Sequence, residues 1–275
     1  MASFGFKERL YKHLARTVVF GTRHGAWFFA RHLPVGRREV LQKYLGRYQF
    51  HIDSTYPIES SIWLFGEYDP MMMRFLRHTL KPGMTFIDVG ANCGAFTLAA
   101  ARAMNEQGRI FAFEPGPPIL ARLRANLALN PAVERMTEVI PYGLGSGPGK
   151  FYYQEEAHNR GNASLFHATG TPVEVITLDS WAKEKGIERV DVIKIDVEGM
   201  EYEVLSGAKE LLSKTKPVIY FETLPDFEAR SGHSLADLYR LLIPLGYQIV
   251  SGDDLVTPVK LHGPYPRNSV AVPSP

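Results

Sequence analysis

Short apolar runs alternate with amphipathic stretches through the middle of the chain. Each run is short enough to be a buried strand, and small or polar residues end it. Strands that alternate with helices form parallel sheets, so the pattern predicts an α/β fold: a doubly wound, Rossmann-like sheet with helices on both faces. The predicted strands are Met84–Val89, Arg109–Phe113, Thr137–Pro141, Val190–Asp196, Pro217–Phe221 and Tyr247–Val250, and the main helices are Ala95–Met104, Pro118–Leu129 and Ser234–Leu242.

The two ends of the chain and one internal stretch depart from this alternation. An amphipathic helix is predicted for residues 3–22, a second helix for Arg37–Leu45 and a short strand for Tyr48–Asp53. We therefore divide the chain into a basic helical N-terminal extension, residues 1–56, and a Rossmann-like domain, residues 57–275. Residues 150–176 read as a β-rich insertion, and His158 lies in its polar stretch as a substrate-side candidate. The proline-rich tail predicts an edge strand with an irregular end.

A glycine turn follows the first predicted strand of the domain. Its residues are typical of a cofactor-binding corner, where backbone N–H groups face an anionic ligand; the candidates are Asp88, Gly90, Ala91, Asn92 and Gly94. A dinucleotide fingerprint, G-x-G-x-x-G, would need glycine where Asn92 stands, and no G-x-x-x-x-G-K-[ST] motif occurs. The remaining common ligand of this corner is S-adenosylmethionine, which carries no phosphate.

An acid ends the second predicted strand, Glu114, 26 residues after Asp88. A carboxylate at this position can accept hydrogen bonds from both ribose hydroxyls of a nucleoside. Tyr142 and Gly143 follow the third strand, where such folds bring the adenine ring. Together with the glycine turn, these residues predict an S-adenosylmethionine site.

Three further carboxylates follow the fourth and fifth strands: Asp196, Glu198 and Glu222. Ligands bind at the carboxyl ends of parallel strands, so these acids are expected near the transferred methyl group, with Asp196 bordering the cofactor as well. An aliphatic hydroxyl is a poor nucleophile until a base removes its proton, and a carboxylate can act as that base. The same cluster could instead bind a divalent cation that lowers the hydroxyl pKa, a reading we do not favour.

The motifs also resemble those of a known family, the FkbM family of S-adenosylmethionine-dependent methyltransferases. The resemblance covers residues 57–225 and rests on the segments FIDVGANCGAFTL, FAFEPGP, VITLDSW, VIKIDVEGMEYEVLSGA and VIYFETLP. It implies a class I methyltransferase fold and O-methylation of a small molecule, a sugar or a lipid-linked glycan. It also implies that Glu67 and Tyr68, just before the cofactor strand, border the substrate.

Charge is unevenly distributed along the 275 residues. Residues 1–47 hold ten Lys and Arg against Glu8 and Glu39, whereas the remainder holds 21 basic and 27 acidic residues. The basic N-terminal helix either docks on the domain, which we favour, or lies on an anionic membrane surface. The single cysteine, Cys93, fits a reducing compartment, and no secretory signal is evident. We expect a cytoplasmic protein, with peripheral contact at the inner membrane surface as the alternative.

Two other classes of function remain as alternatives. A nucleic-acid methyltransferase would need a basic rim where this sequence offers acids, and the turn after the fourth strand is Asp-Val-Glu-Gly instead of the Asn/Asp-Pro-Pro-aromatic turn used on base amines. A non-catalytic membrane- or partner-binding module would be suggested by loss of Glu114 or Asp196, but both are present. We therefore expect a small-molecule, sugar or lipid-linked hydroxyl acceptor and no nucleic-acid partner.

Overall fold

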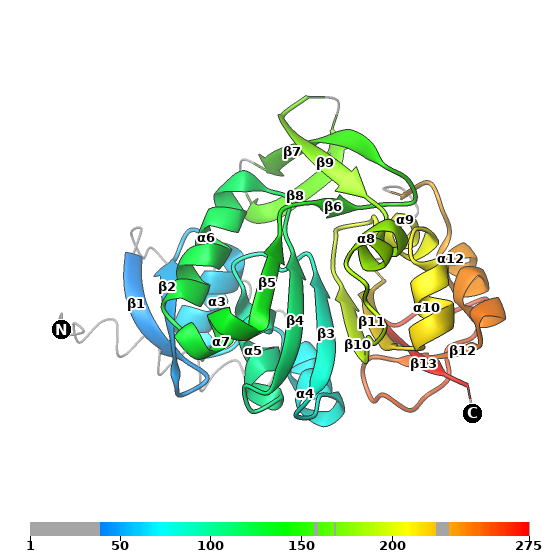
Figure 1. Cartoon of the computed structure of the whole chain (residues 1–275), viewed down its shortest axis with the longest axis horizontal. Helices are drawn as coiled ribbons and strands as arrows, with labels where there is room; N and C mark the ends of the chain where they lie inside the picture. Colours follow the sequence, from blue (N-terminus) through cyan, green and yellow to red (C-terminus); the bar gives the residue numbers. More distant parts are fainter. Residues whose placement is uncertain (1–38, 157–158, 168, 224–230, 275) are drawn as a thin grey trace.

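A seven-stranded sheet forms the centre of the computed structural model, which describes residues 39–156, 159–167, 169–223 and 231–274 (Figure 1). Its strands follow the order β12-β13-β11-β10-β3-β4-β5. The neighbours from β11 to β5 are parallel, and β13 runs antiparallel to both of its neighbours. The strands are β3 (Met84–Val89), β4 (Gly108–Phe113), β5 (Thr137–Ile140), β10 (Val192–Ile195), β11 (Val218–Glu222), β12 (Tyr247–Ser251) and β13 (Asn268–Pro273).

Helices cover both faces of this sheet, and alternate residues of its strands point into two separate cores. Phe86 and Ile110 belong to the core on one face, and their neighbours Ile87 and Phe111 belong to the core on the other. The first core includes residues of α3 (Pro57–Phe65), α4 (Pro70–Thr79), α5 (Ala95–Ala103), α6 (Pro117–Ala128) and α7 (Pro131–Met136). The second includes residues of α8 (Leu178–Glu184), α9 (Glu201–Ser206), α10 (Lys209–Thr215) and α12 (Leu235–Leu242), with the short 3₁₀ helix η2 (Ile243–Leu245) beside it. The doubly wound, Rossmann-like fold predicted from the sequence is confirmed.

The region before α3 is a β-hairpin, and the helix predicted for Arg37–Leu45 is wrong from Glu39 onward. β1 (Glu39–Tyr44) pairs antiparallel with β2 (Tyr48–Asp53), and the predicted strand at Tyr48–Asp53 is confirmed. Tyr44 and Phe50 are fully buried in the first core, so the hairpin packs on the domain. The amphipathic helix predicted for residues 3–22 lies outside the described residues, and the domain boundary at residue 57 stays a prediction.

The last strand of the chain also differs from its prediction. β13 lies inside the sheet between β11 and β12, where Ser269 and Ala271 are fully buried, so it is not an edge strand. Pro258, Pro264 and Pro266 precede the strand and Pro273 ends it, which leaves its interior free of proline. Most of the prolines therefore lie in the segment before the strand, and they do not mark β13 as an edge strand.

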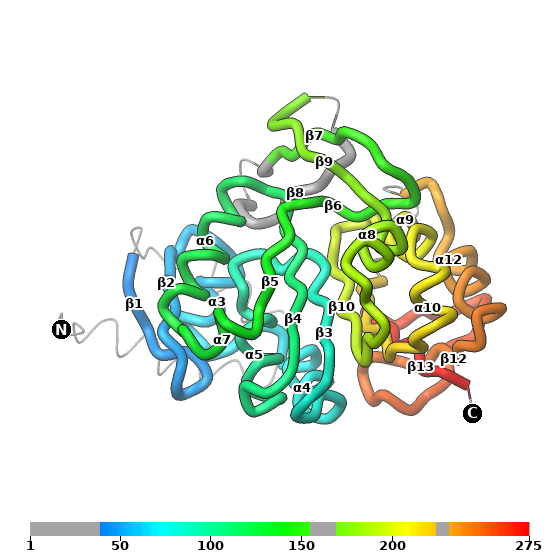
Figure 2. The backbone as a smooth tube through the Cα atoms, in the orientation of Figure 1, coloured from blue at the N-terminus to red at the C-terminus, as the bar shows by residue number. Residues whose placement is uncertain are grey.

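The β-rich insertion forms a second, four-stranded sheet of order β6-β9-β7-β8. Its strands are β6 (Gly143–Leu144), β7 (Gly149–Glu156), β8 (Asn159–His167) and β9 (Thr171–Ile176). Figure 2 shows the insertion above the carboxyl ends of β3, β4 and β5, so the insertion predicted from the sequence is confirmed. His158 lies outside the described residues. Within the described ranges, no helix has the length and apolar character needed to cross a bilayer.

Candidate active site

A cleft opens at the carboxyl ends of β3, β4 and β10, beneath the insertion. Many of the residues predicted for the cofactor site line it together, namely Gly90, Asn92, Glu114, Tyr142, Gly143 and Asp196, and Glu198 joins them. This is the point where the winding of the sheet reverses, since β10 pairs with β3 on the side away from β4. The structure thus brings six predicted cofactor residues together at one cleft, and their contact with a cofactor stays a prediction.

The glycine turn after β3 lies very close to the end of β10. Gly90 has a φ of +73°, and a Cβ atom there would stand 2.1 Å from the Asp196 carbonyl oxygen. Only glycine allows both this conformation and this approach. The N–H groups of Gly90 and Ala91 donate to the Phe113 carbonyl at 3.0 and 2.9 Å, which ties the turn to the end of β4.

Three residues of the predicted cofactor set do not line the cleft. Ala91 is buried, and Gly94 is the N-cap of α5. Asp88 is fully buried beneath the turn, where its Oδ2 accepts a hydrogen bond from Thr97 Oγ1 at 2.7 Å. Its Oδ1 lies 3.1 Å from Lys194 Nζ. Asp88 thus has protein partners beneath the turn, because a residue on β3 alternates into the core, and its predicted role at the cofactor stays a prediction.

Glu114 is the buried acid of the cleft, with 7% of its surface exposed. Its Oε1 accepts a hydrogen bond from Gly116 N and its Oε2 accepts one from Asn92 N, both at 2.9 Å. Burial raises the pKa of this carboxyl to about 7, although the two backbone donors lower it. Each carboxylate oxygen can accept a further hydrogen bond, so Glu114 can hold two hydroxyl groups at once.

Lys194 is a buried lysine that the sequence reasoning did not assign to the site. Its Nζ donates to the carbonyls of Gly90 at 2.6 Å and Val89 at 3.1 Å, and it faces Asp88 at 3.1 Å and Asp196 at 3.9 Å. Burial lowers its pKa, but the Asp88 and Asp196 carboxylates raise it more. The signal was a single cation inside an apolar strand, Val192–Ile195.

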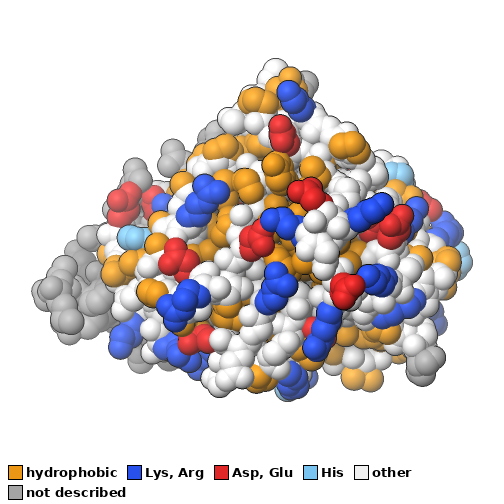
Figure 3. All heavy atoms as spheres, viewed as in Figure 1, with side chains coloured by type: hydrophobic (Ala, Val, Ile, Leu, Met, Phe, Trp, Pro, Cys, Tyr) orange, Lys and Arg blue, Asp and Glu red, His pale blue; other side chains and the backbone are white. Residues whose placement is uncertain are grey.

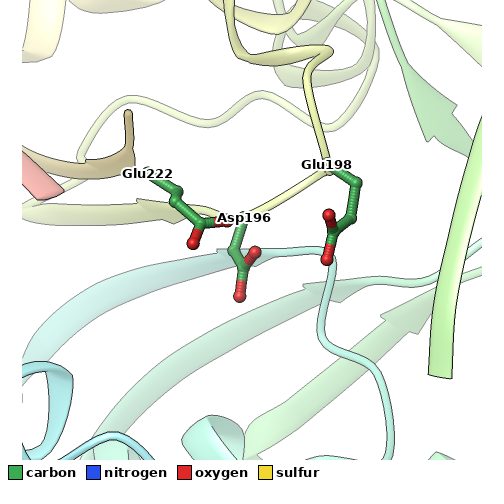
Figure 4. A group of neighbouring side chains, drawn as sticks. All are labelled: Asp196, Glu198 and Glu222. Carbon is green, nitrogen blue, oxygen red and sulfur yellow. The ribbon is translucent and has the colours of Figure 1, made fainter. Parts of the chain in front are cut away.

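Asp196, Glu198 and Glu222 form a compact acid group, with one carboxylate oxygen from each within 4.8 Å of the others (Figure 4). Figure 4 shows Asp196 and Glu222 side by side at the ends of β10 and β11, with Glu198 on the turn that follows β10. Burial, together with the charges of Asp196 and Glu198, raises the pKa of Glu222 well above its usual range. This shift favours the protonated form of Glu222 beside the other two acids. Oxygen atoms at this spacing also suit a hard divalent cation.

Further polar side chains lie near the acid group and do not line the cofactor cleft. Burial and the charge of Asp196 raise the pKa of Tyr68, so this predicted substrate residue lies near the acids. Arg267 Nη2 lies 3.5 Å from Glu222 Oε1, and the buried Tyr220 hydroxyl has no hydrogen-bond partner among the described residues. Glu67 is half-buried, and its charge raises the pKa of Tyr44 in the hairpin, while its place beside the substrate stays a prediction.

The sheet order, the glycine turn and the acid at the end of β4 define a class I methyltransferase. The chain belongs to the FkbM methyltransferase family, because the model of the Methyltransferase FkbM domain matches residues 88–249. S-adenosylmethionine is accordingly its cofactor, and the unused lone pairs of the Glu114 carboxylate fit the two ribose hydroxyls.

Sequence identity to individual proteins is low. The 2-O-methyltransferase NoeI of Sinorhizobium fredii is 27% identical over 207 residues, which cover 68% of this chain and 76% of that protein. The hexuronic acid methyltransferase AglP of Haloferax volcanii is 30% identical over 159 residues, 57% of this chain and 62% of that protein. A solved Methyltransferase FkbM from Methylobacillus flagellatus KT is 17% identical with a TM-score of 0.46, over 79% of this chain and 54% of that one. The chain thus spans about three fifths to three quarters of the length of the two curated relatives.

Glu114 should make cofactor binding depend on pH. Ribose hydroxyls donate to a carboxylate, so they favour the ionised form, and S-adenosylhomocysteine should bind less tightly as the pH falls below about 7, by up to tenfold per unit. Titration calorimetry between about pH 5.5 and 8 measures this slope. In Glu114→Gln the affinity at pH 8 should fall about tenfold to hundredfold and the slope should vanish.

The control for this prediction is Glu201→Gln, because burial raises the pKa of Glu201 to about 7 as well. Glu201 accepts a hydrogen bond from Val197 N and does not line the cleft. A slope that survives in Glu114→Gln but disappears in Glu201→Gln would contradict the assignment.

Proposed function

We propose that the chain methylates a hydroxyl group of a sugar or another small, hydroxyl-rich molecule, free or lipid-linked, with Asp196 as general base. The observation that carries the proposal is the acid group, which starts at the edge of the cofactor cleft and continues away from it. Asp196 and Glu198 line the cleft, and Glu222 lies beside them at the end of β11. A carboxylate is thereby available between the cofactor side and the acceptor side.

Each cofactor-site residue has a distinct task in this proposal. Glu114 holds the ribose hydroxyls, the turn at Gly90 and Asn92 bounds the amino-acid end, and Tyr142 with Gly143 bounds the adenine. S-adenosylmethionine supplies a methyl group made electrophilic by its sulfonium. The protein then has to align the acceptor oxygen with that group and to remove the acceptor proton.

Proton removal is assigned to Asp196 because of the groups around it. Its Oδ2 faces Lys194 Nζ at 3.9 Å, so its negative charge has a buried counter-charge. The raised pKa of Glu222 favours its protonated form, which can donate a hydrogen bond to the acceptor or to Asp196. Glu198 adopts a φ of +55°, in the left-handed region where strain tends to persist at functional positions. A carboxylate next to an acid whose pKa is raised suits general-base chemistry.

The acceptor side is rich in groups that bind hydroxyls. Tyr68, Tyr220 and Arg267 offer two phenols and a guanidinium next to the acid group, which is the donor and acceptor mixture that a polyol needs. The names of two relatives support parts of the proposal, since one is a 2-O-methyltransferase and the other acts on a sugar, a hexuronic acid. On the face shown in Figure 3, basic and acidic side chains are interspersed and form no continuous basic stripe of the kind that tracks nucleic acid.

An acceptor screen tests the proposal. The purified chain is incubated with S-adenosylmethionine and a panel of monosaccharides, uronic acids, polyols, macrocyclic alcohols, amines and short RNA. We expect a product with an O-methyl signal in NMR for at least one hydroxylated compound, and formation of S-adenosylhomocysteine at the same rate. Methylation confined to amines or RNA would overturn the proposal. Cofactor binding with no turnover across the panel would favour a non-catalytic module.

A further inference from the structure

We propose that Tyr153, which the insertion sheet delivers, is a cofactor-binding residue for the nucleoside end of S-adenosylmethionine. Within the insertion the sequence points only to His158, as a substrate-side candidate, and nothing in the glycine turn or the strand ends points to this tyrosine. Tyr153 lies on β7, is 6% exposed, and lines the cleft next to Glu114, Pro115 and Ile119. An aromatic ring at this place would contact the nucleoside end of the cofactor, whose ribose we assign to Glu114.

The contact with Gly116 shows how closely the Tyr153 ring approaches the backbone that follows Glu114. A Cβ atom at Gly116 would stand 2.2 Å from Tyr153 Cε2 and 2.5 Å from its Cζ. The φ and ψ angles of Gly116 are −72° and 113°, which any residue can adopt, so its backbone does not require glycine. The space that the Tyr153 ring occupies is therefore what requires glycine at this position.

The same glycine connects Tyr153 to the ribose-binding acid. Gly116 N donates to Glu114 Oε1 at 2.9 Å, and the ring packs directly on the residue that makes this bond. The ring thus helps to fix the carboxylate and to exclude water from it, in addition to offering its own face to the nucleoside. Aromatic faces bind nucleobases and riboses through dispersion without requiring a hydrogen bond.

Strand pairing within the insertion sheet fixes the position of Tyr153 relative to the cleft. β6 starts at Gly143, one of the cleft residues, and pairs with β9; β9 in turn pairs with β7, where Tyr153 is opposite Thr171. Tyr152 precedes Tyr153 on the same strand, is 40% exposed, and does not line the cleft. Alternation along β7 therefore directs one tyrosine into the cleft and the other away from it.

Paired tyrosine variants test the proposal by titration calorimetry with S-adenosylhomocysteine and with 5′-methylthioadenosine, which lacks the amino-acid end. Tyr153→Ala should weaken both ligands by about tenfold or more, Tyr153→Phe should stay within about threefold of the parent, and Tyr152→Ala should bind as the parent does. Thermal unfolding of every variant is measured in parallel. Tyr153→Leu, which keeps apolar bulk in the sheet, replaces Tyr153→Ala if the latter does not fold.

The outcomes separate this inference from the acceptor chemistry, because it rests on the cofactor alone and no acceptor enters the titrations. Unchanged affinity of the folded Tyr153→Ala or Tyr153→Leu variant would overturn it. An equal loss in Tyr152→Ala would show that the insertion matters only as a packed unit, and would also overturn it. A loss for S-adenosylhomocysteine without a loss for 5′-methylthioadenosine would place the ring at the wrong end of the cofactor.

Discussion

Replacement of Lys194 by methionine should destabilise the fold by about 3–5 kcal/mol, because it leaves a buried carboxylate without its cation. Lys194 is fully buried, and Asp88, which it faces at 3.1 Å, is fully buried too. The variant also removes the hydrogen bonds to the Val89 and Gly90 carbonyls at the glycine turn. Urea unfolding followed by circular dichroism measures the effect as a lower free energy of unfolding.

Two further variants give this prediction its controls. Lys185→Met removes a surface lysine that pairs with Glu138 at 2.7 Å, with both side chains more than two fifths exposed, and should lower the free energy of unfolding far less than Lys194→Met does. The double variant Lys194→Met, Asp88→Asn removes the unpaired charge and should recover part of the loss. If Lys194→Met and Lys185→Met have the same small effect, the buried pair does not stabilise the fold as proposed.

A single sequence predicts some features of this fold and site and cannot predict others. Local signals predict several of these features. Apolar runs predict the parallel strands, glycines predict the turn, and an acid after a strand predicts the role of Glu114. Each of these signals spans only a few residues. The need for glycine at Gly90, in contrast, comes from the Asp196 carbonyl more than a hundred residues away. Because that distant contact requires glycine at this position, the sequence itself shows a glycine in the turn, and the turn can be recognised from it.

Residues whose role depends on a distant pairing partner were harder to place. Val40, Leu41 and Tyr44 fit one side of a helix as well as they fit a strand, and only the pairing with β2 decides for the strand. β13 enters the sheet between two earlier strands, which nothing in its own composition indicates. Asp88 adjoins the turn in sequence, but its pairing with Lys194 follows from strand alternation on two different strands and could not be predicted locally.

Tyr153 and the acceptor side show the same limit at the site itself. Tyr153 reaches the cleft through a second sheet, and its signal is the unexplained Gly116, which becomes informative only once the ring is seen beside it. Asp196, Glu198 and Glu222 were expected together because strand ends of a parallel sheet share one edge, and the structure groups them. What the sequence could not provide is the difference in their surroundings, which raises the pKa of Glu222 and leads us to propose Asp196 as the base.

That difference gives the largest expected effect on activity. Asp196→Asn should lower kcat by about a hundredfold to ten-thousandfold on any acceptor the screen identifies, because an amide of the same shape cannot take a proton. The affinity for S-adenosylhomocysteine should change much less, since Asn keeps the size of the side chain at the cleft wall. Initial rates with saturating cofactor, measured together with calorimetric binding, separate the two quantities.

Glu222→Gln is the matched comparison, because an amide N–H₂ group can replace the hydrogen bond that a protonated Glu222 donates. Burial and the charges of Asp196 and Glu198 favour the protonated form of Glu222, so this variant should retain kcat within about tenfold of the parent. If Glu222→Gln loses as much activity as Asp196→Asn, or Asp196→Asn retains it, then Glu222 or Glu198 is the base and the assignment to Asp196 fails. A loss confined to Asp196→Asn would support Asp196 as the carboxylate that accepts the hydroxyl proton.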